Sequence, residues 1–290
     1  VTAIGTSVGT ITFTASSTTP SAGFWQSIKF GGAGAKGTIS YCNIGYAKQA
    51  VYLENVRNVE VTYNTIRENR GGTGSTGGGE GQGGIGGIGA AIYLYQSNTN
   101  IITNNVLLKN FGGVGGNSTY AGSGGPGGVG SGIYLSQSIE NTITKNNILD
   151  SYGGQGGNGD YMGSGGRGGI GSGIYLSNST SNNIKDNIVT NSFGGSGGSP
   201  GQYYSGSYGA EGGGYGVYIE SDSYNNTIDI TNTYNGYKLH YYYNQTGVTI
   251  ISETIEGTGT TNLGRISLIQ CSKFVIQDCT ISGGSGENGH

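Results

Sequence analysis

Residues 132–152, "GIYLSQSIENTITKNNILDSY", decide the fold of this 290-residue chain. Short runs of Ile, Leu and Thr alternate with polar residues, and Ser and Asn break the runs. A period of two residues is typical of β-strands joined by turns and differs from the 3.6-residue period of a helix. The stretch therefore predicts strand, turn and strand within about 20 residues, the length of one coil of a parallel β-solenoid.

The same unit recurs along the chain. An Ile-Tyr-Leu motif returns at spacings of 41, 41, 41 and 43 residues, with its tyrosines at Tyr52, Tyr93, Tyr134, Tyr175 and Tyr218. A coil cannot bury its inner face alone, so coils must stack, at about 4.8 Å per step. We predict one all-β domain over residues 1–290, a single-stranded right-handed parallel β-helix.

Stacking places equivalent side chains above one another. An asparagine column follows the same period, at Asn64, Asn105, Asn146 and Asn187. Asparagine side chains stacked at this distance hydrogen-bond along the stack. We therefore predict a structural asparagine ladder.

Glycine, with 63 residues, is concentrated in four segments that leave the repeat at the same point. These Gly-rich insertions are residues 71–90, 112–132, 153–173 and 194–216. Each has Gly-Gly-X triplets on both sides of a varied tip such as "NSTYAGS" (117–123). Three prolines are too few for collagen. A flexible linker is the alternative, but the constant length and exit point favour hairpins of two extended, three-residue-per-turn arms, stacked by backbone hydrogen bonds.

Residues 173–192, "GIYLSNSTSNNIKDNIVTNS", resemble the parallel β-helix (PbH1) repeat of the right-handed β-helix superfamily. The resemblance covers about residues 28–281 without the glycine segments. The superfamily includes pectate-lyase-like enzymes, periplasmic copper-maturation proteins and many surface proteins, so it implies a fold and no single activity. The glycine segments resemble the polyglycine-II layers of some phage receptor-binding adhesins and of small glycine-rich antifreeze proteins.

The tyrosine column is a candidate ligand or interface strip. Because the flanking Ile and Leu of each motif are expected to point inward, the tyrosines are expected to point outward. One hypothesis packs this strip under the glycine layers or against a neighbouring subunit. The other makes it a sugar- or receptor-binding strip, since aromatic rings suit both kinds of contact.

Catalytic chemistry has little support in the sequence. Uronic-acid lyases and epimerases on this scaffold need clustered carboxylates, often with calcium, beside Arg or Lys. Here Glu54 and Glu220 share a column but lie four coils apart, and His240 is a lone histidine. One Met and two His give little for copper ligation. We predict no catalytic residue, no cofactor and no metal site.

Composition bounds the partners and the location. The net charge of −3 provides no basic surface for nucleic acid, and no apolar run approaches a membrane span. Three cysteines, Cys42, Cys271 and Cys279, are too few for a disulfide framework. The abundance of Asn, Ser, Thr and Tyr favours an extracellular or cell-surface location. Four sequons are candidate N-glycosylation acceptors: Asn117, Asn178, Asn225 and Asn244.

Neither end shows an amphipathic capping helix, and an uncapped coil exposes unpaired backbone groups. Two explanations stay open: the chain is part of a longer one, or copies join through open β-helix ends into a homopolymer. In the second case, which is the expected partner, Cys42 and Cys279 could lie near each other across a junction. The favoured function is an extracellular, non-enzymatic structural protein, as a self-assembling fibre or surface-layer subunit or an adhesin stalk. The alternatives are an adhesin whose Tyr-rich tips bind a glycan or cell-surface receptor, and a polysaccharide lyase or hydrolase.

Overall fold

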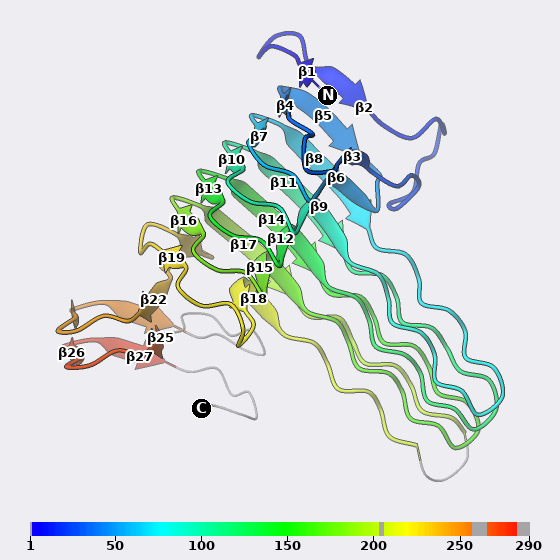
Figure 1. Ribbon diagram of the computed structural model, residues 1–290. Coiled ribbons are helices and arrows are strands. Elements are labelled where there is room, and N and C mark those ends of the chain that lie inside the picture. The colour runs from blue at the N-terminus through cyan, green and yellow to red at the C-terminus, as the bar shows by residue number, and fades with distance from the viewer. Residues whose placement is uncertain (1, 203–205, 257–265, 283–290) are drawn as a thin grey trace.

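A computed structural model describes residues 2–202, 206–256 and 266–282. All elements of regular secondary structure in these ranges are β-strands. Most of the strands belong to three long parallel sheets that run the length of the stack (Figure 1). The described part of the chain contains no helix long and apolar enough to cross a membrane. The architecture is the predicted parallel β-helix.

The strands of the three sheets follow one another in a fixed order. The first sheet holds β3 (Ile28–Gly31), β6 (Gln49–Glu54), β9 (Gly89–Tyr95), β12 (Gly130–Ser136), β15 (Gly171–Ser177) and β18 (Gly214–Ile219). The second sheet holds β1 (Thr2–Ile4), β4 (Gly37–Ser40), β7 (Val59–Thr62), β10 (Ile101–Thr103), β13 (Thr142–Thr144), β16 (Asn183–Lys185) and β19 (Thr227–Ile228). The third sheet holds β2 (Ile11–Phe13), β5 (Cys42–Gly45), β8 (Thr65–Arg70), β11 (Val106–Phe111), β14 (Asn147–Tyr152), β17 (Ile188–Phe193), β20 (Thr233–Tyr234) and the antiparallel β21 (Tyr237–Lys238).

Each coil passes through the first, second and third sheets before the next coil begins. Ile28 pairs with Val51, 23 positions later, whereas Val51 pairs with Ile92, 41 positions later. The glycine insertions account for the difference, because they leave after the third sheet and return before the first. All pairings within the three sheets are parallel except β20–β21.

The interior is filled by ladders of aliphatic side chains. Leu94, Leu135 and Leu176 lie at the same position of successive coils, and each is completely buried. The second and third sheets add ladders of Ile, Val and Leu to the same core. Burying one such side chain stabilises the fold by about 1.5–3 kcal/mol, which explains why Ile, Leu and Val recur at these positions.

Leu135→Ala is expected to lower the free energy of unfolding by about 2–5 kcal/mol, because it opens a cavity in the middle of the ladder. Leu149→Ala is the matched control, since Leu149 is only half-buried in β14. Denaturant unfolding of both variants measures the difference. Equal losses would contradict an inward-facing leucine ladder.

Two asparagine ladders run inside the turns between the sheets. In the first, the amide nitrogens of Asn64, Asn105 and Asn146 each donate to the amide oxygen one coil further on, at 3.0 Å. It continues through Asn187, which donates to Asn232 at 2.9 Å. In the second ladder each amide nitrogen also lies 3.0 Å from the amide oxygen one coil further on. Its members are Asn100, Asn141, Asn182 and Asn226.

The coils turn at residues with positive φ that are not glycine. In the coil of residues 132–152 these are Gln137, Glu140, Lys145 and Asp150, with φ between 50° and 58°. This left-handed conformation costs about 1–2 kcal/mol for a residue with a Cβ atom. The same positions are left-handed in neighbouring coils, so stacking must stabilise these corners.

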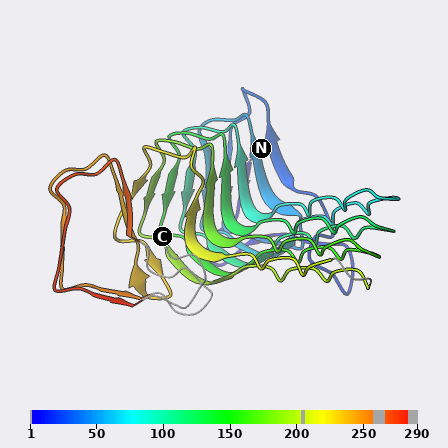
Figure 2. The same ribbon diagram turned by 90° about the horizontal axis from the view of Figure 1, so that it is seen from below.

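The last two coils stand apart from the main stack (Figure 2). They consist of three strand pairs: β22 (His240–Tyr243) with β25 (Ile266–Ile269), β23 (Thr249–Ile251) with β26 (Val275–Gln277), and β24 (Thr254–Glu256) with β27 (Thr280–Ser282). None of these strands pairs with the three long sheets. The first sheet therefore ends at β18, which has a paired neighbour only on the side of β15.

Candidate functional site: the glycine slab and its tips

The four glycine insertions form a slab that projects from one edge of the β-helix (Figures 1 and 2). We call them layers one to four; they are residues 71–88, 112–129, 153–170 and 194–213. The predicted segments extended two or three residues further, but those residues begin the next strands of the first sheet. Layers one to three are hairpins with an outgoing arm, a tip and a return arm, and in layer four the described residues are 194–202 and 206–213.

Backbone hydrogen bonds of three kinds join the arms. Within layer two, the Gly125 N–H donates to the Gly116 carbonyl at 2.8 Å. Towards layer one, Gly116 N–H donates to Gly84 at 2.8 Å, and towards layer three Gly115 N–H donates to Gln155 at 2.8 Å. The same pattern repeats between layers three and four. A network of this kind satisfies the polar groups of chain that belongs to no strand.

Glycine is required because the arms approach backbone to backbone. A Cβ atom at Gly113 would lie less than 3.0 Å from the carbonyl oxygen of Gly72 in the layer before it. A Cβ atom at Gly127 would meet Gly154 of the following layer equally closely. The X residues of the triplets point away from these contacts, and Gln155 is exposed. The Gly-Gly-X period thus records which positions face another arm.

The tips of the slab carry exposed aromatic side chains. Tyr120 of layer two and Tyr161 of layer three stack with ring centroids 5.7 Å apart and planes 4° apart. They are 61% and 42% exposed, and Met162 beside them is 50% exposed. The Asp160 carboxylate accepts the Tyr120 backbone N–H at 3.0 Å, which fixes the two tips together. The Tyr-rich tip of layer four, residues 200–208, lies partly outside the described residues.

The tyrosine column is aligned, but it lies under the slab. Its rings follow one another at 4.6–5.2 Å, from Tyr52 to Tyr218. Ile88, Val129 and Ile170 of the return arms pack against this column. Tyr134 and Tyr175 are only 8% and 4% exposed, so the expectation of an exposed strip is wrong at these two. The packing hypothesis is the one that the burial favours.

The tyrosine hydroxyl groups have partners on the outer face of the first sheet. Tyr52 donates to Glu54 at 2.9 Å, and Tyr175 donates to Glu220 at 2.7 Å. Glu54 also receives the Lys29 ammonium at 2.6 Å, and both contacts hold the pKa of its carboxyl below the usual range. These two acids therefore have structural partners.

Ionisation of the buried tyrosines is expected to lag behind that of free tyrosine. Burial first, and then the Glu220 carboxylate, raise the pKa of Tyr134 and Tyr175 above the ordinary 10.0. The stability that these neutral phenols contribute is complete below about pH 10, where the unfolded chain titrates, and is lost as pH rises through the raised values. Absorbance titration should show a late tyrosinate step that accompanies unfolding. Ionisation of all tyrosines near pH 10, with circular dichroism unchanged, would contradict this.

A second aromatic ladder lies at the carboxyl ends of the third-sheet strands. It was not predicted as a site from the sequence. Phe111, Tyr152 and Phe193 stack at 5.2 and 5.5 Å, and the Arg70 guanidinium lies 4.7 Å from the Phe111 ring centre. The four residues recur every 41 positions, directly before each Gly-Gly pair. This period could have identified the ladder from the sequence. Because stacked rings cover one another's faces, this ladder offers mainly edges to a ligand.

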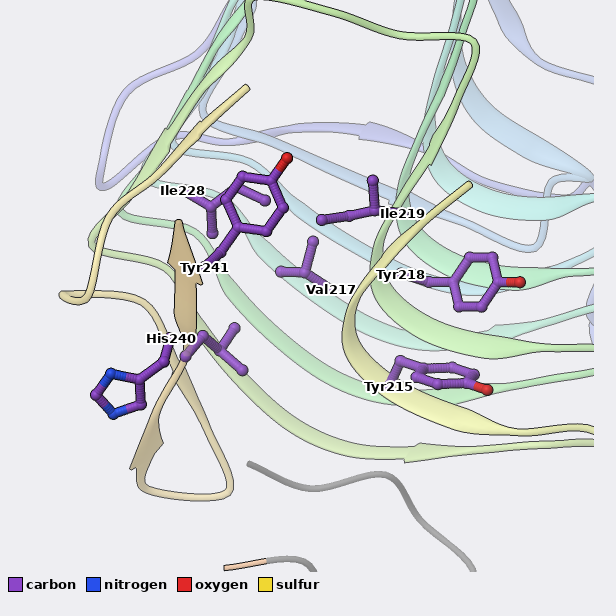
Figure 3. Close-up of a pocket in the computed structure, with 8 residues that line it drawn as sticks. Tyr215, Val217, Tyr218, Ile219, Ile228, His240 and Tyr241 are labelled. Atoms are coloured by element: carbon purple, nitrogen blue, oxygen red, sulfur yellow. The ribbon is translucent and has the colours of Figure 1, made fainter. Parts of the chain in front are cut away.

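A small cleft lies where the stack is interrupted, between β18 and β19 on one side and β22 on the other. Its volume is about 90 Å³. Val217 and Ile219 point towards Tyr241 and Ile228, whereas Tyr215 and Tyr218 project from the other face of β18 (Figure 3). The lining is largely the end of the aliphatic core, so the cleft is a packing gap between coils.

His240 turns away from that core group (Figure 3) and lies 3.3 Å from the Tyr242 hydroxyl. Burial lowers the pKa of its imidazole. The ring has no carboxylate hydrogen-bonded to it among the described residues, and the nearby Glu253 pairs with Lys238 at 2.6 Å. This arrangement is that of a packing histidine.

The remaining predicted residues are spread over the molecule. All four sequon asparagines are exposed, with Asn117 at a tip and the others in the turns of coils: Asn117, Asn178, Asn225 and Asn244. The three cysteines are free. Cys42 is the first residue of β5 and Cys279 directly precedes β27 in a different coil, and each thiol lies 3.3 Å from the carbonyl two residues earlier.

Comparison with known proteins places the chain in a family. The family model described as "Periplasmic copper-binding protein (NosD)" matches residues 34–209, which include the first three glycine layers and most of the fourth. The chain belongs to this family. Among solved structures, a mutant of the periplasmic alginate epimerase AlgG aligns with 15% identity and a TM-score of 0.34. The alignment covers 84% of this chain and 50% of that one, so the chain spans half the epimerase's length. No curated protein matches the sequence.

The residues that the structure describes do not fit a copper site. Copper favours imidazole, thiolate and thioether ligands brought to one point. Here His240 lies in β22, Met162 lies at a slab tip, and Cys42 is buried in β5. The described ranges contain no group of three or more His, Cys, Asp or Glu side chains placed to hold a metal ion.

Proposed function

We propose that this protein is an exported, non-enzymatic scaffold of the adhesin-stalk type, in which the β-helix and the glycine slab hold the tips out for contact with a glycan or receptor. The slab is the observation that carries the proposal. Four layers are bonded to one another along both arms, and the tips of layers two and three carry the exposed Tyr120 and Tyr161 rings.

The cost of ordering glycine supports a display role. Fixing the backbone of one residue costs about 1–2 kcal/mol, and glycine loses more freedom than any other residue. A tether needs no such order, and it does not need glycine at the inner positions where a Cβ atom would collide with the next layer. A rigid slab is useful where the tips must keep a fixed position relative to the β-helix.

The chemistry of the acidic side chains supports a non-enzymatic role. Glu54, Glu68 and Glu253 pair with lysines at 2.6–3.3 Å, and Glu220 accepts the Tyr175 hydroxyl. Glycoside cleavage uses two carboxyl groups about 5–10 Å apart that are free to exchange protons. Export is supported by the word "periplasmic" in the family's description and by a composition poor in charge; an extracellular surface location is part of the proposal.

Removal of the tip rings tests the proposal. The Tyr120→Ala/Tyr161→Ala variant is expected to bind an immobilised glycan panel or a cell-surface preparation at least tenfold more weakly than the parent, which corresponds to about 1.4 kcal/mol. Tyr63→Ala is the control, because Tyr63 is 50% exposed but lies on the β-helix, where it stacks on Tyr41. Undiminished binding by the tip variant, or cleavage of a uronic-acid polysaccharide by the parent, would refute the proposal.

A further inference from the structure

We propose that Pro200, Tyr208 and Glu211 close the outer face of layer four, and that they prevent the glycine arms of a second copy of this chain from adding to the slab. The proposal concerns assembly. It rests on the register of the four layers and does not depend on what the tips bind.

The outer face of layer four has backbone groups that are paired in the inner layers. Gly153 and Gly156 of layer three donate to Phe193, the last residue of β17, and to Ser196 of layer four at 2.8 and 2.9 Å. Their equivalents in layer four are Gly194 and Gly197. Within the described residues, the N–H groups of these two glycines have no partner. An unpaired edge of this kind is a template for another chain.

Side chains appear on the return arm of layer four where the other layers have glycine. A Cβ atom at Gly165 or Gly168 of layer three would lie less than 3.0 Å from backbone atoms of layer four. Gly165 and Gly168 donate to the carbonyls of Ser207 and Ala210 at 2.8 Å. The residues of layer four that are equivalent to these two glycines directly follow Ser207 and Ala210 in the sequence. Those residues are Tyr208, 77% exposed, and Glu211, also exposed.

A proline appears on the outgoing arm at the equivalent position near the tip. Gly77, Ser118 and Gly159 each donate a backbone N–H to the next layer at 2.9–3.0 Å. The equivalent of these residues in layer four is Pro200, which has no N–H to donate. Layer four thus lacks a donor on one arm and carries a phenol and a carboxylate on the other.

These three residues act together against a further layer. A glycine arm approaching layer four would meet two side chains at positions where the inner layers leave no room even for a methyl group. It would also bury the Glu211 carboxylate against backbone without a counter-charge, which is unfavourable. Charges and prolines on exposed edges are a recognised protection against unwanted pairing.

Layer one carries a comparable but weaker block. Gly116, Gly157 and Gly198 face the preceding layer so closely that a Cβ atom at each would lie less than 3.0 Å from its backbone. In layer one the equivalent residue is Ser75, which is exposed. At the positions of Ser75, Tyr208 and Glu211, a side chain replaces glycine only in the layer that has no described neighbour on that side, which is the pattern expected if the four-layer limit is encoded.

A release variant tests the proposal: Pro200→Gly/Tyr208→Gly/Glu211→Gly. The control variant carries the same number of new glycines at X positions of layer four, Ser199→Gly/Ser207→Gly/Ala210→Gly, whose side chains are exposed. Light scattering at increasing protein concentration should show at least a twofold higher mass for the release variant than for the control and the parent. The Tyr208→Gly/Glu211→Gly variant, which keeps Pro200, guards against misfolding of the triple variant, and it should show the same direction of change.

The outcomes are distinct from those of the binding test. A release variant that keeps the mass of the control over the whole concentration range would overturn the proposal, as would equal association of both variants. A parent that binds no glycan or receptor would refute the display role and leave this inference standing. Self-association of the release variant, together with normal glycan or receptor binding by the tips, would support both the block at layer four and the display role.

Discussion

Gly113→Ala is expected to disrupt the contact between the first two glycine layers, whereas Gly72→Ala is expected to leave the protein almost unchanged. The two glycines are equivalent residues of successive layers. The new methyl group at Gly113 would meet the Gly72 carbonyl at less than 3.0 Å. At Gly72 the nearest atoms to a new Cβ would be those of the Lys48 side chain, 3.9 Å away.

The expected size of the Gly113 effect follows from two contributions. Overpacking a filled site costs about 1–3 kcal/mol. Separation of the layers also removes the bonds from Gly113 N–H to Gly87 and from Gly116 N–H to Gly84, at about 0.5–1.5 kcal/mol each. Gly113→Ala should therefore destabilise the slab by about 2–6 kcal/mol, and faster amide exchange in residues 71–88 and 112–129 should report it. Equal effects of the two alanines would mean that the layers do not pack as described.

Asn146→Ala is expected to be strongly destabilising, because Asn146 lies in the middle of the first asparagine ladder. The Asn146 amide oxygen accepts from the backbone and side chain of Asn105, at 3.1 and 3.0 Å. Its amide nitrogen donates to the carbonyls of Ile102 and Thr144 and to Asn187, at 3.0–3.1 Å. The side chain is 1% exposed, so no bulk water replaces these bonds.

Each buried group left without a partner costs about 1–3 kcal/mol, so Asn146→Ala should lower the free energy of unfolding by about 3 kcal/mol or more. Asn147→Ala is the control, because the adjacent Asn147 is exposed at the start of β14. Thermal and denaturant unfolding compare the two. A loss at Asn146 no greater than that at Asn147 would show that the ladder contributes little.

Asn146→Asp adds a test of the ladder by pH. The new carboxyl would be buried and would face two carbonyl oxygens, so its pKa should rise above the value of about 4 in the unfolded chain. With a raised folded-state pKa, the variant should be most stable below about pH 4 and should lose stability as pH rises through the raised value. A stability profile parallel to that of the parent between pH 3 and 7 would contradict a buried ladder.

The fold was predictable because the repeat is long and regular. The 41-residue period identified the coils, and inward Ile and Leu alternating with outward Tyr identified the strands of the first sheet. The same period also runs through Asn100, Asn141 and Asn182, so the second asparagine ladder could have been found by the same comparison. It was missed because the turn that contains it carries no distinctive motif.

Burial of the tyrosine column could not be read from alternation. Alternation tells which side of a strand a residue occupies, and it does not tell what covers that side. Tyr134 and Tyr175 point outward from the β-helix core and are nevertheless buried, because the return arms of the glycine hairpins bend over them. The cleft beside β18 could not be predicted from the sequence either. The sequence beyond Ile219 departs from the 41-residue period, and β22 joins none of the three long sheets.

The role of the residues that interrupt the glycine pattern in layer four could be recognised only from the structure. Pro200, Tyr208 and Glu211 interrupt the glycine pattern of the last segment, and as a sequence feature they indicate only a richer tip. These positions are in register with Gly159, Gly165 and Gly168 of layer three, each of which donates a hydrogen bond to the following layer. The departures from the repeat therefore mark the surface at which stacking stops.

Amide hydrogen exchange of the glycine segments tests the central claim most directly, because the backbone N–H groups themselves hold the layers together. The account predicts that Gly115, Gly116 and Gly127 exchange as slowly as the strands of the first sheet, since each donates a 2.8 Å hydrogen bond. It predicts fast exchange at Gly194 and Gly197 on the uncovered face. Uniformly fast exchange through residues 112–129 and 153–170, at the rate of an unfolded chain, would show that the glycine segments are linkers and would contradict the account.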